Sequence, residues 1–443
     1  MELLGVTVTI AAFFVSISIR RMPEITKTTL TYRRAKAKRS RLRRTITKIT
    51  AAVLLIALLT SSLGYYRYAT ALPLMHAQLQ VNSYSPPTPS PLKWPDTGQA
   101  AVGTTDYGVL EAHGDQKPVP TASTAKLITL LAVLESKPLR KNDQGPTLVM
   151  GERDVQSYHS YVSQLGSVVP VNFGEKITQY QAFQAVLLAS ANNMADSLAI
   201  WAFGSLENYS LYANQMIESY GLKNTTVGND ASGLSPTTTS TASDLLVIAQ
   251  RALRNPIIAE IVAQKSATIP VAGRIYNTNW LLGSDGINGV KTGNSDEAGG
   301  VFILSGTHAV GAGSTTILTV VMGSPDVKSA MEASKALFDS AKPNLTFVEV
   351  VRSGDTVGKY VSPWGKTVTA VAVQTINGPI WLDSFDQPEF KFDTIKAPKK
   401  IGDTVGEITF KRADGIKMTS EIRLSQDLPA PSIKWRLFRG DSM

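Results

Sequence analysis

Residues 49–66 (ITAAVLLIALLTSSLGYY) carry no charged side chain over 18 positions, which is long enough for a helix to cross the hydrocarbon core of a membrane. The residues before them hold twelve Lys and Arg, all between Arg20 and Lys48, and only two acids. Because cationic segments remain on the cytoplasmic side, the pattern predicts a basic cytoplasmic segment over 1–48 and a transmembrane helix over 49–66. Everything after Arg67 should then lie outside the cytoplasm.

Two features of the amino-terminal segment leave alternatives open. A cleavable signal peptide would share the basic and apolar pattern, and residues 69–71 (Ala-Thr-Ala) offer a cleavage site with small residues. Arg67 and the tyrosines around it are typical of an interfacial belt, which favours a retained anchor. A second uncharged stretch, residues 3–19, would either complete a hairpin across the membrane or lie before a true start at Met22.

The composition of the chain excludes several classes of protein. The net charge of +9 is local, because outside the basic segment the chain has 32 basic and 33 acidic residues, and nucleic acid is therefore not an expected partner. The absence of cysteine excludes disulfides, thiolate catalysis and zinc fingers. The four histidines show no ligand spacing such as HExxH, so no metal site is expected.

The exported part divides into a spacer and two regions of different apolar periodicity. Five prolines within residues 83–96 indicate a stiff linker, which we assign to 67–97. Residues 98–342 alternate helical and strand-like patterns and predict a mixed α/β (α+β) domain in which helices flank a sheet. Residues 346–435 are rich in strand-like alternation, and the turn sequence GDTVG occurs there twice, so we expect a smaller all-β domain.

A serine and a lysine at helical spacing stand near the start of the α/β region. Residues 121–135 (TASTAKLITLLAVLE) have a helical apolar face, and Ser123 and Lys126 lie three positions apart in its first turn. At that spacing the two polar tips are adjacent. A lysine that is kept neutral by burial can accept a hydroxyl proton, so the pair is a candidate nucleophile and general base.

Two more polar motifs follow along the chain. Ser190 and Asn192 separate two apolar helical stretches, where a turn can aim them into a cleft, although a helix cap is the simpler interpretation. The sequence GVKTG places Lys291, Thr292 and Gly293 at a predicted strand edge. A cation, a hydroxyl and open backbone can bind an anionic group there, although a solvated hairpin is the simpler interpretation.

The three motifs together are far more specific than each alone. In the order SxxK, SxN and KTG they resemble the D-alanyl-D-alanine carboxypeptidase family, the low-molecular-mass serine penicillin-binding proteins. GEKIT at 174–178, NDASGL at 229–234 and NTNWLL at 277–282 resemble the same family. The resemblance implies a serine β-lactamase/transpeptidase-like domain over 98–342, followed by the family's β-rich carboxy-terminal domain over 346–435.

The resemblance also implies a reaction. Ser123 would attack the peptide bond between two terminal D-alanines, with neutral Lys126 as general base and no cofactor. Ser190 would relay the proton to the leaving amine, and Asn192 would hold the substrate amide or orient Lys126. Lys291 would bind the terminal carboxylate and lower the pKa of Lys126 by like charge. The expected catalytic residues are Ser123, Lys126 and Ser190, and the expected substrate-binding residues are Asn192, Lys291, Thr292 and Gly293.

This reading places the protein in a bacterial cell membrane, with its catalytic domain outside the cytoplasm. The expected partners are peptidoglycan stem peptides as substrates, β-lactam antibiotics as covalent inhibitors, and the membrane itself. The oxyanion hole would be formed by the backbone N–H of Ser123 and one from the strand after Lys291.

Two alternatives share the same motifs. A serine β-lactamase would need a base for rapid deacylation, and Glu207 and Asp230 lie in the expected interval, though not in a glutamate-rich loop. A catalytically silent scaffold could bind cell-wall peptides, but every motif group is intact. A Ser-His-Asp hydrolase is weaker still, since the sequence has no GxSxG elbow.

Overall fold

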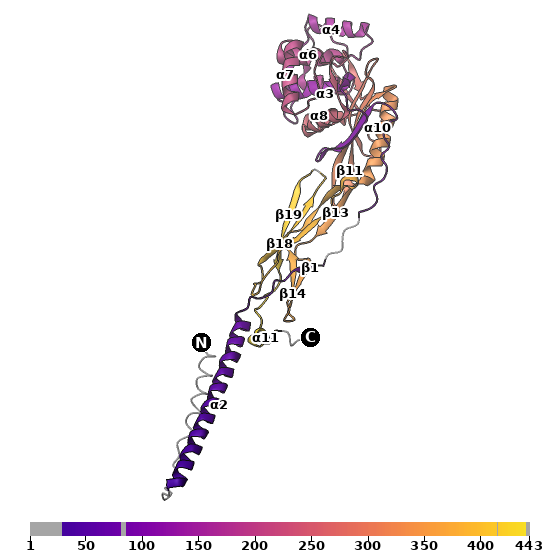
Figure 1. The fold of residues 1–443 in the computed structure, drawn as a ribbon. Coiled ribbons are helices and arrows are strands. Elements are labelled where there is room, and N and C mark those ends of the chain that lie inside the picture. The colour runs from indigo at the N-terminus through magenta and orange to yellow at the C-terminus, as the bar shows by residue number, and fades with distance from the viewer. Residues whose placement is uncertain (1–28, 81–85, 414, 440–443) are drawn as a thin grey trace. The chain divides into compact units, whose positions relative to one another are not determined.

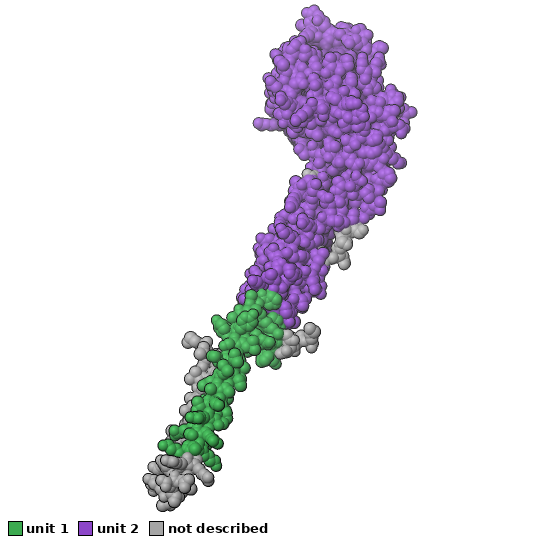
Figure 2. Space-filling view, viewed as in Figure 1, with its two compact units in different colours: residues 1–73, 429–443 green, residues 74–428 purple. Residues whose placement is uncertain are grey.

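The computed structural model describes residues 29–80, 86–413 and 415–439, so the uncharged stretch at 3–19 lies outside the described residues. The chain forms two compact units, which Figure 2 colours separately. Unit 1 comprises the chain up to Pro73 together with the residues from Pro429 onward. Unit 2 comprises Leu74–Leu428.

Unit 1 is built on one long helix, α2 (Thr29–Ala69), which includes the whole uncharged stretch (Figure 1). Its portion Lys36–Ala69 is long and apolar enough to cross a membrane, with a mean hydropathy of 1.9 over the best window and none of that window buried inside the protein. The short helix α11 (Ile433–Leu437) packs against α2, and the Ser432 hydroxyl caps it by accepting a bond from the Trp435 N–H at 3.2 Å. Unit 1 therefore joins residues from both ends of the chain.

A five-stranded antiparallel sheet forms the centre of the mixed helix and strand region of unit 2. Its strands, in spatial order, are β10 (Ile287–Ser295), β11 (Gly299–Val310), β12 (Gly313–Ser324), β2 (Gln99–Thr104) and β3 (Gly108–His113). Both faces are apolar, because Val301 and Ile303 belong to one core cluster while Phe302 and Leu304 belong to another. Helices cover both faces, and strand β10, which carries the KTG motif, lies at one edge.

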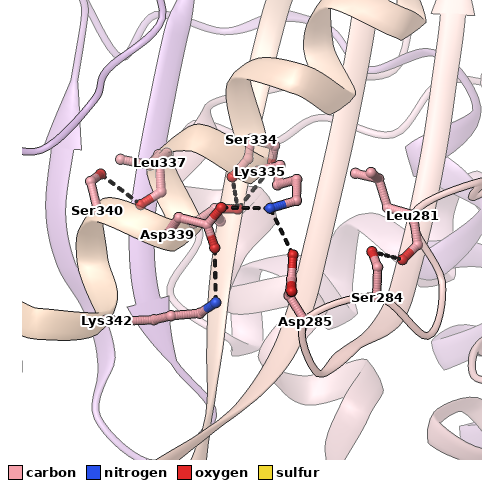
Figure 3. Close-up of polar contacts among 10 residues, drawn as sticks. Leu281, Ser284, Asp285, Ser334, Lys335, Leu337, Asp339, Ser340 and Lys342 are labelled. Carbon is pink, nitrogen blue, oxygen red and sulfur yellow. Dashed lines mark hydrogen bonds and ion pairs between the residues drawn. The ribbon is translucent and has the colours of Figure 1, made fainter.

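One face of this sheet is covered by α10 (Val327–Ala341), which packs on β11 and β12. Figure 3 shows the polar contacts of this helix. The Lys335 ammonium lies 2.9 Å from Asp285 Oδ2 and 2.6 Å from Asp339 Oδ2, and Lys342 lies 2.8 Å from Asp339 Oδ1. Asp285 stands in the turn before β10, so these ion pairs connect the helix to the segment that leads into the KTG strand.

The other face is covered by a group of helices around α3 (Lys126–Ser136), whose first nine residues are all buried. The surrounding helices are α4 (Glu152–Ser163), α5 (Gln179–Leu187), α6 (Asn192–Phe203), α7 (Leu206–Ser219), α8 (Ala242–Arg254) and α9 (Pro256–Val262). Polar caps start several of them: Thr178 caps α5, Ser205 caps α7 and Thr241 caps α8. Short strand pairs connect these helices: β4 (Val119–Pro120) with β7 (Thr239–Ser240), β5 (Thr147–Val149) with β6 (Lys176–Thr178), and β8 (Ser266–Ile269) with β9 (Gly273–Tyr276).

The rest of unit 2 is strand-rich. A six-stranded sheet contains β1 (Ala77–Leu79), β14 (Thr356–Val361), β15 (Thr367–Ala372), β19 (Lys417–Leu424), β18 (Thr404–Lys411) and β17 (Glu389–Phe392), and a separate pair contains β13 (Leu345–Val351) and β16 (Ile376–Trp381). In both GDTVG repeats the first glycine has a positive φ, +90° at Gly354 and +85° at Gly402, and a strand begins two residues later.

The proline-rich pattern predicts no strand in the spacer 67–97, yet β1 lies within it. Residues 77–79 pair with 358–360 of β14, and Met75 bridges to Ile395. Only three residues take part, too few for a periodic pattern to be recognised among the prolines that follow. The predicted division into domains over 98–342 and 346–435 stays a prediction, and residues 429–435 at the end of the second lie in unit 1.

Candidate active site

Ser123 and Lys126 are brought together by a short helical turn. The 3-10 turn η2 (Ala122–Ala125) leads directly into α3, so Ser123 stands one turn before the first residue of the helix. The Thr124 hydroxyl supports this turn by donating to the Thr121 carbonyl at 2.7 Å. Lys126 is fully buried, and its Nζ lies 2.8 Å from Ser123 Oγ. The predicted pair is therefore in hydrogen-bond contact.

The other contacts of Lys126 orient its amine. Nζ also lies 2.7 Å from Asn192 Oδ1 and 2.7 Å from the Ser232 carbonyl oxygen. These two oxygens can only accept hydrogen bonds. A neutral amine would therefore use both of its N–H groups on them, which leaves its lone pair facing the Ser123 hydroxyl. That is the arrangement that a general base needs.

Burial sets the charge state of Lys126. Desolvation lowers its pKa to about 7, although the charges of Asp230 and Asp196 act to raise it. Burial was one of the two predicted causes and is the largest, whereas the other, like charge from Lys291, is not among the causes that act on Lys126. The like-charge effect appears instead on Lys291, whose pKa is held well below its usual value first by burial and then by Lys126.

Ser190 and Lys291 form a second contact pair. Ser190 lies in the turn between α5 and α6 with φ +58°, a conformation that is uncommon for residues other than glycine. Its hydroxyl accepts a hydrogen bond from Lys291 Nζ at 2.9 Å, and the same nitrogen donates to the Thr292 carbonyl at 2.9 Å. The helix-cap interpretation of Ser190 is wrong, since α6 begins after Ala191 without a side-chain cap.

The KTG strand lies against the turn that carries Ser123, and Lys291 and Thr292 are buried, which excludes the solvated-hairpin interpretation. At Gly293 an added Cβ would lie 3.2 Å from the Ser123 backbone nitrogen and 3.2 Å from Ala122 Cβ. Glycine at this position thus allows the strand to approach the Ser123 N–H closely.

Thr278 is a residue of the candidate site that the sequence does not predict. Its hydroxyl lies 2.7 Å from the Thr292 hydroxyl, and the neighbouring Asn279 donates from its side chain to the Gly289 carbonyl at 3.1 Å. These contacts tie the NTNWLL segment to the KTG strand. The NTNWLL sequence resembles the family pattern. It does not by itself predict that the threonine between the two asparagines contacts Thr292.

A buried acidic network lies next to Lys126. The Asp230 carboxylate accepts hydrogen bonds from the Ser232 N–H, the Ser232 hydroxyl and the Ser235 N–H, each at 2.7 Å. Tyr161 on α4 donates to Asp196 Oδ2 on α6 at 2.7 Å. Burial raises the pKa of Asp196 to about 6, and the Tyr161 hydrogen bond opposes that change. Asp196 had no sequence signal, since it belongs to none of the three motifs.

A cavity of about 730 Å³ opens beside these groups. Tyr161, Asp196 and Asp230 line it, together with residues 294–297, which follow the KTG motif. Ser123 is partly exposed, whereas Lys126, Ser190 and Lys291 are buried. In the described part of the chain, no cluster of three or more His, Cys, Asp or Glu could hold a metal ion.

This fold and this site define a serine acyl-transfer enzyme, with a hydroxyl held against a buried amine and a second hydroxyl–lysine pair nearby. The family model of D-alanyl-D-alanine carboxypeptidase matches residues 101–326, about half of the chain, and the chain belongs to this family of serine hydrolases. The resemblance inferred from the three motifs is therefore confirmed.

Relatives named D-alanyl-D-alanine carboxypeptidase support the assignment. DacF of Bacillus subtilis is 24% identical over 332 residues, which cover 72% of this chain and 82% of DacF. DacB2 of Mycobacterium tuberculosis is 30% identical over 209 residues, covering 46% of this chain and 67% of DacB2. The alignment with DacF extends beyond the residues that the family model matches.

Solved structures show the same fold. The peptidoglycan synthesis regulatory factor (PBP3) of Streptococcus pneumoniae has a TM-score of 0.56 at 21% identity, covering 76% of this chain and 100% of that chain. Penicillin-binding protein 5 of Haemophilus influenzae has a TM-score of 0.54 at 20% identity, covering 78% of this chain and 100% of that chain. The predicted mixed fold with helices around a sheet is confirmed.

Proposed function

We propose that this protein is a serine-type D-Ala-D-Ala carboxypeptidase that trims the terminal D-alanine from peptidoglycan stem peptides through an acyl-enzyme on Ser123. The observation that carries the proposal is the set of three contacts of Lys126. Two obligate acceptors take its N–H groups, and the third contact is the Ser123 hydroxyl. With a pKa of about 7, the amine is neutral in a large fraction of molecules at neutral pH.

In the acylation step the Ser123 oxygen forms a bond to the carbonyl carbon of the penultimate D-alanine, and the hydroxyl proton moves to Lys126. The carbon–nitrogen bond to the terminal D-alanine then breaks. Ser190, whose hydroxyl accepts a hydrogen bond from Lys291, would relay the proton from Lys126 to the leaving amine, so that Lys126 becomes neutral again. Water subsequently hydrolyses the ester, which releases the trimmed peptide and restores the Ser123 hydroxyl.

Substrate binding falls to the KTG strand and its neighbours. Lys291 and Thr292 would hold the terminal carboxylate, as a cation and a hydroxyl side by side suit an anionic group. Gly293 lets the strand pass close to the Ser123 N–H, which supports an oxyanion hole formed by that N–H and one from the strand. Asn192 is bound to Lys126, which supports its orienting role.

The β-lactamase alternative is less well supported. Glu207 is exposed at the start of α7, and Asp230 is occupied by three hydrogen bonds within its own loop. Asp230 is therefore not free to activate a water molecule at the acyl-enzyme, and Glu207 does not line the cavity beside the site.

The protein is anchored in the bacterial cell membrane by α2, with the basic segment in the cytoplasm and the catalytic region outside it. The support is the length and apolar character of the helix together with the cations that precede its uncharged stretch. Stem peptides of the cell wall would then be reached from the outer surface of the membrane.

The test is time-resolved intact mass spectrometry of the full-length protein with benzylpenicillin, a β-lactam that the same serine would attack. We expect a slowly decaying adduct of one drug molecule, and Ser123→Ala should form none. Ser90→Ala is the matched control, because Ser90 belongs to a second SxxK sequence in the spacer, and it should form the adduct normally. Rapid turnover of the drug would support the β-lactamase, and no adduct would support the silent scaffold.

A further inference from the structure

Two carboxyl groups lie in the interior next to Lys126, and they differ in how they are held. Asp230 receives three hydrogen bonds from its own loop. Asp196 receives one, from the Tyr161 hydroxyl, and its other oxygen, Oδ1, makes no hydrogen bond of good geometry within the described residues, although the Ala231 N–H faces the carboxylate. Only 7% of Asp196 is exposed, so water does little to stabilise its charge.

A chain of contacts connects Asp196 to Lys126. The Tyr161 hydroxyl lies 2.7 Å from Asp196 Oδ2 and 3.3 Å from the Ser232 hydroxyl. The carbonyl of the same Ser232 accepts a hydrogen bond from Lys126 Nζ at 2.7 Å. Asp196 therefore acts on the lysine in two ways, through its charge and through the residue that orients the amine.

We propose that Asp196 and Tyr161 form a positioning pair that keeps Lys126 a base of useful strength, by holding a negative charge and an ordered Ser232 against the buried amine. The proposal rests on the proposed role of Lys126 as general base. Neither residue belongs to the SxxK, SxN or KTG motifs, and neither touches Ser123 in the contacts described above.

The physical reason is a balance of opposing effects on one amine. Burial alone would make Lys126 a weak base, which is neutral at every working pH but accepts the serine proton poorly. Asp196 and Asp230 raise its pKa back toward neutrality. The Tyr161 hydrogen bond in turn lowers the pKa of Asp196, so that Asp196 is largely ionised at pH 7. The titratable groups that face Asp196 are Tyr161 on α4, Asp230 in the loop before β7 and Lys126 on α3.

The test measures the second-order rate of acylation by benzylpenicillin from pH 5 to 9, using the full-length protein. In Asp196→Asn the acid limb of the pH–rate profile should move to lower pH by about half a unit or more, which equals about a threefold change in rate on that limb. The plateau rate at high pH should also fall. Tyr161→Phe should shift the limb in the same direction by less. Asp196→Glu should restore the limb toward that of the wild type.

Asp154→Asn is the matched control for packing. Asp154 is an aspartate on α4 that accepts a hydrogen bond from Ser197 on α6, so it joins the same two helices without acting on Lys126. This variant should keep the wild-type limb. A double variant, Asp196→Asn with Tyr161→Phe, should shift no further than Asp196→Asn alone.

Two results would overturn the inference. One is a uniform loss of rate in Asp196→Asn with the limb unmoved, which would indicate a packing role only. The other is additive shifts in the double variant, which would mean that the two residues act separately. A wild-type protein that forms no adduct at any pH would instead refute the proposed function, so the two failures are distinguishable.

Discussion

The turn that carries Ser123 should be very sensitive to one added methyl group at Gly233. This glycine has φ +74°, and an added Cβ would lie 2.2 Å from the Ala122 carbonyl oxygen and 2.7 Å from Ala125 Cβ. Gly174 has a similar φ of +80°, but an added Cβ there would meet nothing within 4 Å. Gly174→Ala therefore isolates the backbone strain, and Gly233→Ala adds a collision directly before Ser123.

The magnitudes follow from these distances. Both variants should lose about 1–2 kcal/mol of unfolding free energy from the left-handed backbone. Gly233→Ala should lose a further ~1–3 kcal/mol from overpacking. Real contacts stay beyond 3.0 Å, so the Ala122 carbonyl must move by about 0.8 Å. Because a displacement of about 1 Å in a reacting group can cost about 10²-fold in rate, acylation should fall by roughly 10- to 100-fold.

The assay combines chemical denaturation with the rate of benzylpenicillin acylation. Gly174→Ala should acylate within about twofold of the wild-type rate, since its strain lies away from the site. Equal acylation rates in the two alanine variants would refute the reasoning, because they would show that the turn absorbs the collision without displacing Ser123.

Three other outcomes follow from the charges of the site. Acylation of the wild type should rise about tenfold between pH 6 and 8 as Lys126, with a pKa of about 7, becomes neutral, and a flat profile would contradict this. Lys126→Arg should form no benzylpenicillin adduct by intact mass, because a guanidinium stays protonated; an adduct would exclude the lysine as base. Asp196 has a folded pKa of about 6 against an ordinary 3.8, so its ionisation destabilises the fold as pH rises through that interval, by up to about 3 kcal/mol. Asp196→Asn should therefore melt at a higher temperature than the wild type at pH 7.5 but not at pH 3.5, and equal melting at both would contradict the assignment.

Some of the site could be predicted from sequence because its geometry is local. Ser123 and Lys126 are three residues apart, and helical geometry alone brings their tips together. The contacts of Lys126 with Asn192 and Ser232 span 66 and 106 residues, and only folding creates them. Ser232 contributes its backbone carbonyl, and a backbone contact cannot be predicted from the type of residue.

The residues that were missed have no periodic signal. Asp196 meets Tyr161, 35 residues away, only because α4 packs on α6. Thr278 reaches Thr292 because a loop is tied to the edge strand. The sequence does not predict strand β1 for a similar reason. Its three residues gain their strand conformation from pairing with β14 rather than from their own pattern.

Contacts within unit 1 favour α2 as a retained anchor over a removed signal peptide. The Arg439 guanidinium donates to the carbonyls of Thr70 at 2.7 Å and Ala71 at 3.1 Å, which belong to the small-residue site where a signal peptidase would cut. The Arg67 guanidinium, near the end of α2, donates to the Leu437 carbonyl at the end of α11 at 3.0 Å. Cleavage near residue 71 would discard these contacts, so we expect the mature protein to keep the helix.

Intact mass of the protein extracted from membranes tests this expectation, and a mass that begins after Ala71 would contradict it. Arg439→Gln removes the two contacts at the small-residue site and should make that segment more open to limited proteolysis in detergent. Arg423→Gln is the matched control, because Arg423 pairs with Glu421 on the exposed side of β19, and it should digest as the wild type does. If both variants digest alike, the contacts of Arg439 do not protect the segment, and retention of the helix must then depend on its apolar length alone.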